Sequence, residues 1–550
     1  MNPVRLLVHG TGLSGAKVLV ETKGISASNV SVNGSGTYLF VDVTIGKQVR
    51  PGPVTLSVVT NSGRVAVPFE IAKPLDRANR FQGFSPDDVI YLIMPDRFSN
   101  GDVSNDDPAI SRGLFDPSKP RYYHGGDLQG VIDKLPYLKS LGITAIWLNP
   151  IYDNVNHLNE KEKYDGQAIT DYHGYGAVDF YAVEEHFGTL AKFRELVDKA
   201  HATGIKIIQD QVANHSGPYH PWVTDSPTPT WFNGTASKHL DNTWQTWTLM
   251  DPSADPALKR ETLDGWFINI LPDLNQGDKE TRRYLIQNTL WWLGVSGMDG
   301  IRQDTWPYVP RDFWRDWMAA IKREYPKVAA VGEVFDGDPA FTSFSQGGRK
   351  GFDGIDTGVD SVFDFPLYFA IRNAFAQGGS VRDVAKVLGH DALYPDPQML
   401  VTFLGLHDVQ RFMNEKGATV EGLELALTFL MTTRGIPMIY YGDEVALPGG
   451  NDPDNRRDMP ASAFALTNRT QAVVRNLAVL RGKHESLRRG KTIHLYTSDQ
   501  VFVYARVSGD DHVAVLINNG STAAKVSVQL PWEQTARTFE VAARSSAIRE

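Results

Sequence analysis

Short stretches of alternating apolar and polar residues fill the first part of the chain. They read VRLLVHG (residues 4–10), AKVLVET (16–22), TYLFVDVTI (37–45), VTLSVVT (54–60) and RVAVPFEI (64–71), with Gly, Ser and Asn between them. An alternation of period two puts the apolar side chains of a strand on one face. Residues 1–84 are therefore predicted to form a small β-sandwich, followed by a linker without periodicity.

From about residue 85 the pattern changes to apolar strands that alternate with amphipathic helices. The candidate strands read VIYLIMP, ITAIWLNP, IKIIQDQ, GIRQD, VAAVGEV, SVFDFPL, LVTFLGL and IPMIYYG, and segments such as LQGVIDKLPYLKSLG, TLAKFRELVDKAHATG and ETRRYLIQNTLWWLGVSG are the helices between them. Eight strand–helix units predict an α/β fold, a (β/α)8 TIM barrel over residues 85–488. In such a barrel the chemistry belongs at the carboxyl ends of the strands.

Two further segments complete the predicted architecture. Residues 216–270 separate the third strand from its helix and are rich in Pro, Trp, Asn and Thr. This segment is too long for a simple connection and indicates a functional inserted domain. Residues 489–550 return to alternating strands and predict a C-terminal β-sandwich.

Composition narrows the classes of partner and site. Lys and Arg number 55 against 64 Asp and Glu, so the net charge is 55 − 64 = −9, which disfavours nucleic acid and anionic membranes as partners. The absence of cysteine excludes disulfides, thiol catalysis and thiolate metal sites, and leaves metals with oxygen ligands open. The 12 Trp, 20 Tyr and 26 Phe serve the core, but such a number of rings also suits the flat apolar faces of sugars.

The compartment stays open. The chain starts MNPVRLLVHGTG without a basic-then-apolar leader, and it has no apolar run long enough to span a bilayer. A cytoplasmic protein and a processed periplasmic or secreted chain both fit, with the second slightly favoured.

Polar residues follow four of the predicted barrel strands, where strand ends share one rim. They are Asp210, Asn214 and His215 for the third strand, Arg302 and Asp304 for the fourth, Glu333 for the fifth, and His407 and Asp408 for the seventh. A single pair such as Arg302 and Asp304 is more often a structural clamp. Four such clusters on one rim indicate a site.

The segments that hold these residues resemble the sequence motifs of a known family. DQVANH (residues 210–215), GIRQD (300–304), GEVFD (332–336), FLGLHD (403–408) and LPDLNQ (271–276) are similar, in order and spacing, to motifs of the α-amylase family of glycoside hydrolases (family 13). The resemblance implies cleavage with retention, in which one carboxylate attacks the anomeric carbon while a second protonates the leaving oxygen. It implies Asp304 as the nucleophile, Glu333 as the general acid and base, and Asp408 as a third carboxylate that binds sugar hydroxyls.

The same resemblance nominates residues that bind the substrate. These are His173, Tyr175, Asp210, His215, Arg302, His407, Asp452 and Arg456. Arg302 lies two residues before Asp304 on one strand face and would keep that carboxylate ionised. For Tyr175, an ordinary core tyrosine is an equal alternative without the family context.

The segment NGDVSNDDP (residues 100–108) has closely spaced oxygen ligands. A polar turn would explain it, but it also resembles the calcium loop of cyclodextrin-processing relatives. The resemblance implies one structural Ca²⁺ held by Asn100, Asp102, Asn105, Asp106, the Gly125 carbonyl and Asp127. A second Ca²⁺, found in many α-amylases near the equivalent of Asn214, is in doubt because Tyr308 replaces a histidine there.

The N-terminal sandwich resembles the leading domain of cyclomaltodextrinases, neopullulanases and maltogenic amylases. It implies an α-1,4-glucan hydrolase acting on cyclodextrins and maltooligosaccharides, with pullulan or starch as further candidates, and a homodimer formed through this domain. A plain α-amylase and a transglycosylase are the alternatives. A non-catalytic glucan-binding protein is a remote third, since such relatives typically lose the carboxylates that this chain keeps.

Overall fold

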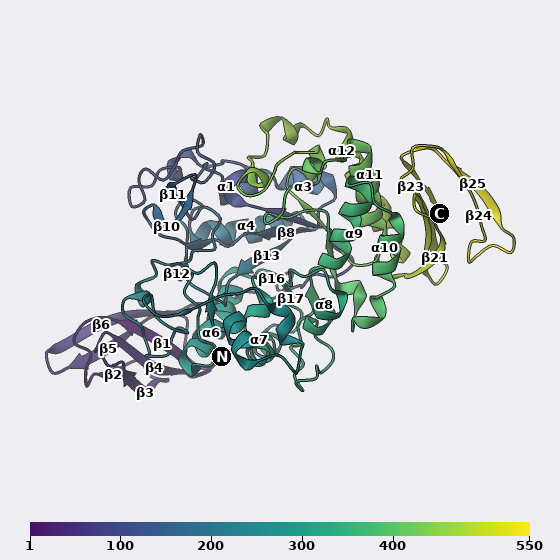
Figure 1. Cartoon of the computed structure of the whole chain (residues 1–550). Helices are drawn as coiled ribbons and strands as arrows, with labels where there is room; N and C mark the ends of the chain where they lie inside the picture. The colour runs from purple at the N-terminus through teal and green to yellow at the C-terminus, as the bar shows by residue number, and fades with distance from the viewer.

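The computed structural model describes residues 1–550 and has three parts, with a barrel between two β-sandwiches (Figure 1). The barrel strands are β7 (Ile90–Ile93), β8 (Ala145–Leu148), β13 (Lys206–Gln211), β16 (Gly300–Gln303), β17 (Ala329–Gly332), β18 (Ser361–Val362), β19 (Val401–Phe403) and β20 (Ile436–Tyr440). They form one parallel sheet in the order β18-β17-β16-β13-β8-β7-β20-β19. A parallel bridge between Phe363 and Val401 joins its two edges. The predicted (β/α)8 barrel is confirmed, strand by strand.

Helices surround this barrel. They are α2 (Leu128–Asp133), α3 (Leu135–Leu141), α4 (Leu190–Ala202), α6 (Lys279–Ser296), α7 (Arg311–Glu324), α8 (Pro339–Ser345), α9 (Phe365–Ala376), α10 (Val381–Leu388), α11 (Val420–Thr432), α12 (Arg469–Lys483) and α13 (Glu485–Arg489), with a short α1 (Pro95–Phe98) after β7. The single helix expected over residues 128–142 is divided into α2 and α3 at Lys134. Pro136 lies in the first turn of α3, where its missing N–H is tolerated, whereas one continuous helix would need that donor.

The N-terminal part consists of two three-stranded sheets that enclose a small core of their own. The sheets are β1-β4-β3 and β2-β5-β6, with β1 (Val4–His9), β2 (Lys17–Val20), β3 (Ile25–Val32), β4 (Tyr38–Ile45), β5 (Gly52–Thr60) and β6 (Gly63–Ile71). The sequence pattern missed β3, because its segment ISASNVSV carries mostly Ser and Asn, and only pairing with β4 makes it a strand. Arg5 ties this sandwich to α6 through an ion pair with Glu280 of 2.8 Å.

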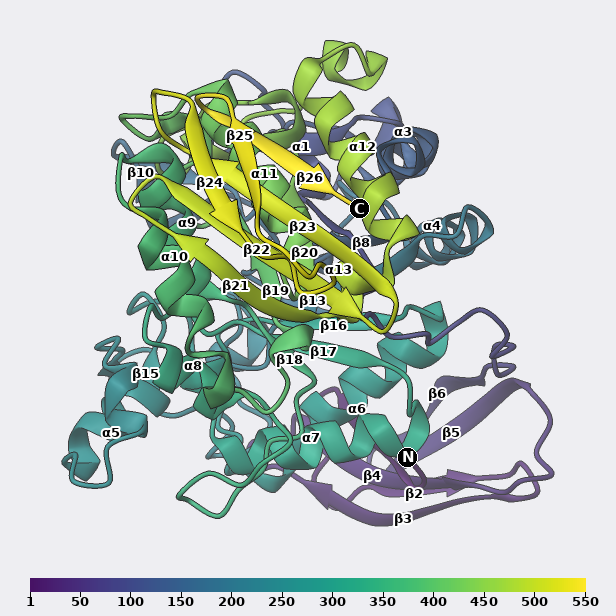
Figure 2. The same ribbon diagram turned by 90° about the vertical axis from the view of Figure 1, so that its right-hand side faces the viewer.

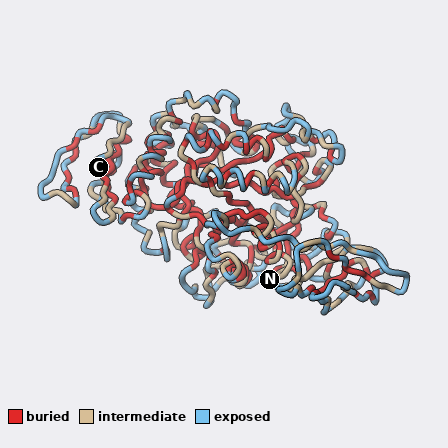
Figure 3. Tube along the Cα trace, turned by 180° about the vertical axis from the view of Figure 1, so that it is seen from behind, coloured by how far each residue is buried: buried red, intermediate tan, exposed pale blue.

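The C-terminal part is a second β-sandwich, drawn in yellow in Figure 2. One layer is the sheet β21-β22-β23-β26 and the other is the pair β24-β25. The bounds are β21 (Lys491–Thr497), β22 (Val501–Ser508), β23 (Asp511–Asn518), β24 (Ala524–Val528), β25 (Arg537–Val541) and β26 (Ser545–Arg549). In both sandwiches and the barrel, buried segments alternate with exposed loops (Figure 3).

Two excursions leave the barrel at the carboxyl ends of its strands. The one after β13 contains β14 (Leu240–Asp241), α5 (Pro256–Leu263) and β15 (Gly265–Trp266) and corresponds to the predicted insertion. The other, after β8, was not predicted and contains β9 (Tyr152–Asp153), the hairpin of β10 (Asn159–Tyr164) and β11 (Gln167–Ile169), and β12 (Asp179–Val183). None of the helices is both long and apolar enough to cross a membrane.

Gly332, the last residue of β17, has no room for a side chain. A Cβ there would lie 2.7 Å from the indole of Trp306, which is buried. We expect Gly332→Ala to destabilise the barrel by about 1–3 kcal/mol, the usual range for overpacking. Thermal unfolding measures the effect. Gly482→Ala in α12, where a Cβ meets nothing within 4 Å, is the control and should leave the melting temperature unchanged or raise it. An equal fall in both variants would contradict the packing argument.

Candidate active site

A cavity of about 580 Å³ opens at the carboxyl ends of the barrel strands. Asp304, Glu333 and Asp408 line it; the first two directly follow β16 and β17, and Asp408 lies in the loop after β19. A larger cavity of about 890 Å³ lies between the N-terminal sandwich and the barrel, but none of the strand-end carboxylates reaches it. The smaller cavity is therefore the candidate active site.

The register of the parallel sheet brings the acidic residues to one arginine. Asp210 on β13 pairs with Arg302 on β16, and Asp304 lies two residues further on the same face. Arg302 Nη1 is 2.9 Å from Asp210 Oδ1 and 2.7 Å from Asp304 Oδ1, and its Nη2 is 2.7 Å from Glu333 Oε1. One buried cation thus contacts three carboxylates, of which Asp304 and Glu333 face the cavity.

Asp210 lies behind the cavity wall. Its Oδ2 accepts hydrogen bonds from Trp147 Nε1 at 3.0 Å and from the Tyr175 hydroxyl at 2.8 Å. Neither Asp210 nor Arg302, both nominated as substrate-binding residues, is on the surface of the cavity, because Tyr175 and Asp304 cover them. The structure places them where they orient Tyr175 and Asp304.

Burial keeps protons on part of this cluster. Burial raises the pKa of Glu333 to about 8, an effect that Arg302 opposes and Asp304 reinforces. Burial also raises the pKa of Asp210 to about 7, again against Arg302. A single guanidinium cannot compensate three carboxylates in a site of low dielectric, so the protonated acid at neutral pH is Glu333.

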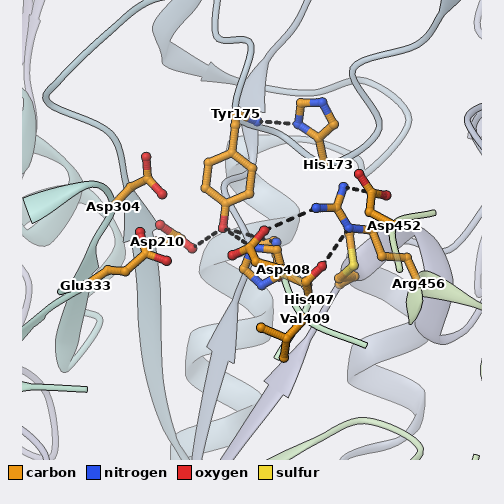
Figure 4. Close-up of polar contacts among 12 residues, drawn as sticks. His173, Tyr175, Asp210, Asp304, Glu333, His407, Asp408, Val409, Asp452 and Arg456 are labelled. Carbon is orange, nitrogen blue, oxygen red and sulfur yellow. Dashed lines mark hydrogen bonds and ion pairs between the residues drawn. The ribbon is translucent and has the colours of Figure 1, made fainter. Parts of the chain in front are cut away.

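A second group of residues surrounds Asp408 (Figure 4). Asp408 Oδ2 is 3.1 Å from His407 Nε2, and Asp408 Oδ1 is 3.2 Å from Arg456 Nη2. Arg456 also contacts Asp452 at 3.4 Å and donates to the His407 carbonyl at 2.9 Å. The His407 ring stacks on Tyr175 at 5.4 Å, which joins this group to the first.

The three predicted histidines all lie in the cavity wall. Burial lowers the pKa of His173, His215 and His407, so the rings are neutral at pH 7. His173 Nδ1 accepts a hydrogen bond from the Tyr175 amide at 3.1 Å. His215 Nε2 and His407 Nδ1 are buried and have no hydrogen-bond partner in the protein.

The opposite half of the cavity is aromatic and was not predicted. Trp244 and Phe267 come from the insertion, and Tyr308 and Phe335 follow the fourth and fifth barrel strands. Trp244 is 48% exposed and packs edge-on against Phe267 at 4.5 Å. Phe335 lies two residues after Glu333, so the strand-end argument could have found it. Trp147 and Asn149, at the end of the second strand, could have been found in the same way.

The loop with the proposed calcium ligands is compact. Asn100 Nδ2 lies 2.7 Å from Asp106 Oδ1, a Cβ on Gly125 would meet both atoms at 2.7 Å, and Asn105 Oδ1 is buried without a partner. Asp127 caps α2, and its carboxylate accepts the N–H groups of Gly101, Asp102 and Gly130. Burial and the nearby Asp102 raise the pKa of Asp106, as expected where negative oxygens crowd without a cation. These residues fit a hard cation.

A second group of oxygens surrounds Asn214. One end of its side-chain amide is 3.2 Å from the Tyr308 carbonyl and 3.3 Å from Asp273 Oδ1, and the other end is 3.2 Å from His215 Nδ1. If the amide nitrogen faces the first two groups, it donates to both. If the oxygen faces them, three oxygens converge, as around a cation. The contact is with the backbone of Tyr308, so the replacement of histidine there does not remove it.

The comparisons with known proteins agree with this geometry. The family model described as the alpha amylase catalytic domain matches residues 92–472, well over half of the chain, and the model described as the cyclomaltodextrinase N-terminal domain matches residues 1–74. The chain belongs to the α-amylase family of glycoside hydrolases. One relative in this family is a neopullulanase 2 from Thermoactinomyces vulgaris, which is 32% identical to this chain over 80% of this chain and 71% of that protein.

Two further members of the α-amylase family differ in how much of their length this chain covers. A beta/alpha-amylase from Paenibacillus polymyxa is 35% identical over 78% of this chain, which spans only 33% of that longer protein. The crystal structure of an Anoxybacillus alpha-amylase superimposes with a TM-score of 0.72 at 34% identity, over 84% of this chain and 97% of that one.

Proposed function

We propose that this protein is a retaining α-glucan hydrolase that cleaves α-1,4-glucosidic bonds in cyclodextrins and maltooligosaccharides through a covalent glycosyl-enzyme. The observation that supports it most strongly is that Arg302 contacts both Asp304 and Glu333 at 2.7 Å, so two carboxyl groups that share one cation face one cavity. A close pair of this kind is the arrangement of retaining glycosidases.

In the first step Asp304 attacks the anomeric carbon and Glu333 gives its proton to the leaving glycosidic oxygen. Arg302 stabilises the negative charge of Asp304, and the raised pKa of Glu333 supplies the proton at neutral pH. Glu333 is left ionised. In the second step it removes a proton from water, whose oxygen attacks the same carbon, and Asp304 leaves.

The group of residues around Asp408 holds the glucose unit that becomes covalently attached to Asp304. Asp408 and His407 present an oxygen and a neutral ring to its hydroxyl groups, and the Tyr175 ring offers an apolar face. Arg456 orients the Asp408 carboxylate through an ion pair. The sugar bound here lies on the Asp408 side of Asp304, and the leaving group lies on the Glu333 side.

Three features support cyclodextrins as substrates. The N-terminal residues match the cyclomaltodextrinase N-terminal domain, and two related proteins are named cyclomaltodextrinases. The aromatic half of the cavity, on the leaving-group side, offers apolar ring faces for sugars. The same rings could hold a sugar acceptor in place of water, which is the basis of the transglycosylase alternative.

Activity on β-cyclodextrin, maltoheptaose, pullulan and soluble starch tests the proposal. We expect ring opening of β-cyclodextrin by the parent protein, and a loss of at least about 10³-fold in Asp304→Asn, because covalent catalysis is removed. Asp510→Asn, on an exposed turn of the C-terminal sandwich, should retain the parent rate. Full activity of Asp304→Asn would overturn the mechanism. Products longer than the substrate at high maltotriose would favour the transglycosylase.

The pH profile of kcat/KM tests the role of Glu333. Its acid form is required, and burial raises its pKa to about 8, so activity should persist at neutral pH and fall as the pH rises through about 8. In Glu333→Gln, kcat/KM should fall by about 10²–10⁴-fold, and the decrease near pH 8 should disappear. A parent profile that already declines near pH 5, close to the pKa of an ordinary glutamate, would contradict the assignment.

We further propose structural Ca²⁺ in the loop of Asn100, Asp102, Asn105, Asp106, Gly125 and Asp127, and a second ion between Asn214, Asp273 and the Tyr308 carbonyl. The orphaned Asn105 oxygen supports the first site, and the convergence on Asn214 supports the second. Both ions would brace loops that follow barrel strands rather than take part in bond cleavage.

Metal content after dialysis tests the calcium sites. We expect two Ca²⁺ per chain in the parent and one in Asp106→Asn, with a lower melting temperature, since at 100 times Kd a bound ion contributes about 2.7 kcal/mol. Asp107→Asn is the neighbouring control, because Asp107 serves the Gly113 amide instead. It should keep both ions. Equal metal content in Asp106→Asn and the parent would exclude the first site.

A further inference from the structure

The cavity has a charged end opposite its aromatic half. Beyond Asp408 and Arg456, on the side away from Glu333, the wall is formed by Arg121, Asn159, Glu162, Asp171 and Asp452. Given the proposed direction of the substrate, glucose units on the non-reducing side of the cleaved bond must extend toward this end. Its shape therefore limits how many of them fit.

The β10–β11 hairpin contributes Glu162 to this end by an irregularity in its pairing. Asn159 pairs with Ile169, but the next regular pair is Lys163 with Ala168, so the residues between them bulge from the ladder. A bulge turns side chains out of the regular alternation and is a common way to aim one at a site. Here it directs Glu162 into the cavity wall, whereas Glu160 on the same strand is exposed.

A buried asparagine holds the bulge in place. Asn159 Oδ1 accepts the amides of Lys161 at 3.0 Å and Glu162 at 3.1 Å, and its Nδ2 donates to Asp171 Oδ1 at 3.0 Å. Asn159 and Asp171 are 1% and 2% exposed. The backbone of Glu162 is thus anchored to the barrel side of the cavity, and its position does not depend on the exposed tip of the hairpin.

Arg121 connects Glu162 to the residues around Asp408. Arg121 Nη1 is 3.0 Å from Glu162 Oε1, and its Nη2 is 2.5 Å from Asp452 Oδ2. Asp452 in turn contacts Arg456, which contacts Asp408. The backbone of Arg121 is held as well, since its carbonyl accepts from the Thr170 amide at 3.0 Å. Both terminal nitrogens of Arg121 therefore bind carboxylates of the protein.

We propose that Glu162 is a specificity-determining residue. Its ion pair with Arg121 holds the β10–β11 hairpin against the charged end of the cavity and closes that end. The closed end limits the number of glucose units that bind on the non-reducing side of the cleaved bond. The inference rests on the proposed hydrolysis of α-glucans. Loss of the Glu162 carboxylate frees one terminal nitrogen of Arg121, a donor that can then hydrogen-bond a sugar hydroxyl, and opens space for a further glucose unit. The enzyme then cuts longer segments from the non-reducing end.

Cleavage of maltoheptaose labelled at its reducing end tests this. The parent should release short segments, and Glu162→Gln should move the main cut at least one glucose unit toward the label. We expect the ratio of the two products to change by about tenfold, the effect of one gained or lost sugar contact. Glu162→Lys, which repels Arg121, should shift the cut further. Since maltotriose is too short to use the new space, its kcat/KM should change less in Glu162→Gln than the ratio of the maltoheptaose products does.

Glu160→Gln is the matched control and should leave the cutting position unchanged. If Glu162 only stabilised the hairpin, its variants would lower the melting temperature and leave the cutting position as in the parent, and this result would overturn the proposal. An equal shift in Glu160→Gln would also overturn it. A parent protein without hydrolytic activity would instead refute the proposed function, so the two failures are distinguishable.

Discussion

A single buried cation, the guanidinium of Arg302, faces three carboxylates at the centre of the barrel. Burying one acid costs several kcal/mol unless a positive charge or a proton compensates it, and here one charge is shared by three acids. Protons compensate the remaining negative charge, since burial raises the pKa of Glu333 and of Asp210. Of the two acids that face the cavity, Glu333 is the one whose pKa burial raises. The proposed chemistry needs a proton on that acid.

The barrel supports this arrangement because its parallel register is fixed along the whole sheet. Asp210 pairs with Arg302, and Gln303 pairs with Gly332, so the residues that follow, Asp304 and Glu333, emerge side by side. A slip of one residue would send Arg302 to the opposite face and leave the acids without a cation. Gly332 allows Trp306 to pack against the strand at this point.

The two excursions divide the cavity between different kinds of side chain. The insertion after β13 supplies Trp244 and Phe267 to the aromatic half, and the hairpin after β8 supplies Glu162 at the charged end. The loops on a barrel can differ without disturbing the register beneath them. In the proposed enzyme, the loops would therefore set the length and shape of the substrate, and the strands would set the acid–base chemistry.

The sequence by itself determined the barrel and most of the proposed site. Eight apolar strands, each too buried to alternate, are visible in one dimension, and polar residues at their ends must share a rim because parallel strands end together. The pattern could not reveal β3, whose polar segment is a strand only beside β4, nor the break between α2 and α3. Only the tertiary structure decided that Asp210 and Arg302 lie behind the wall, that Trp244 borders the cavity, and that Glu162 meets Arg121 across 41 positions of sequence. These facts depend on register, burial and contacts between distant segments, and a local pattern of residues does not encode such quantities.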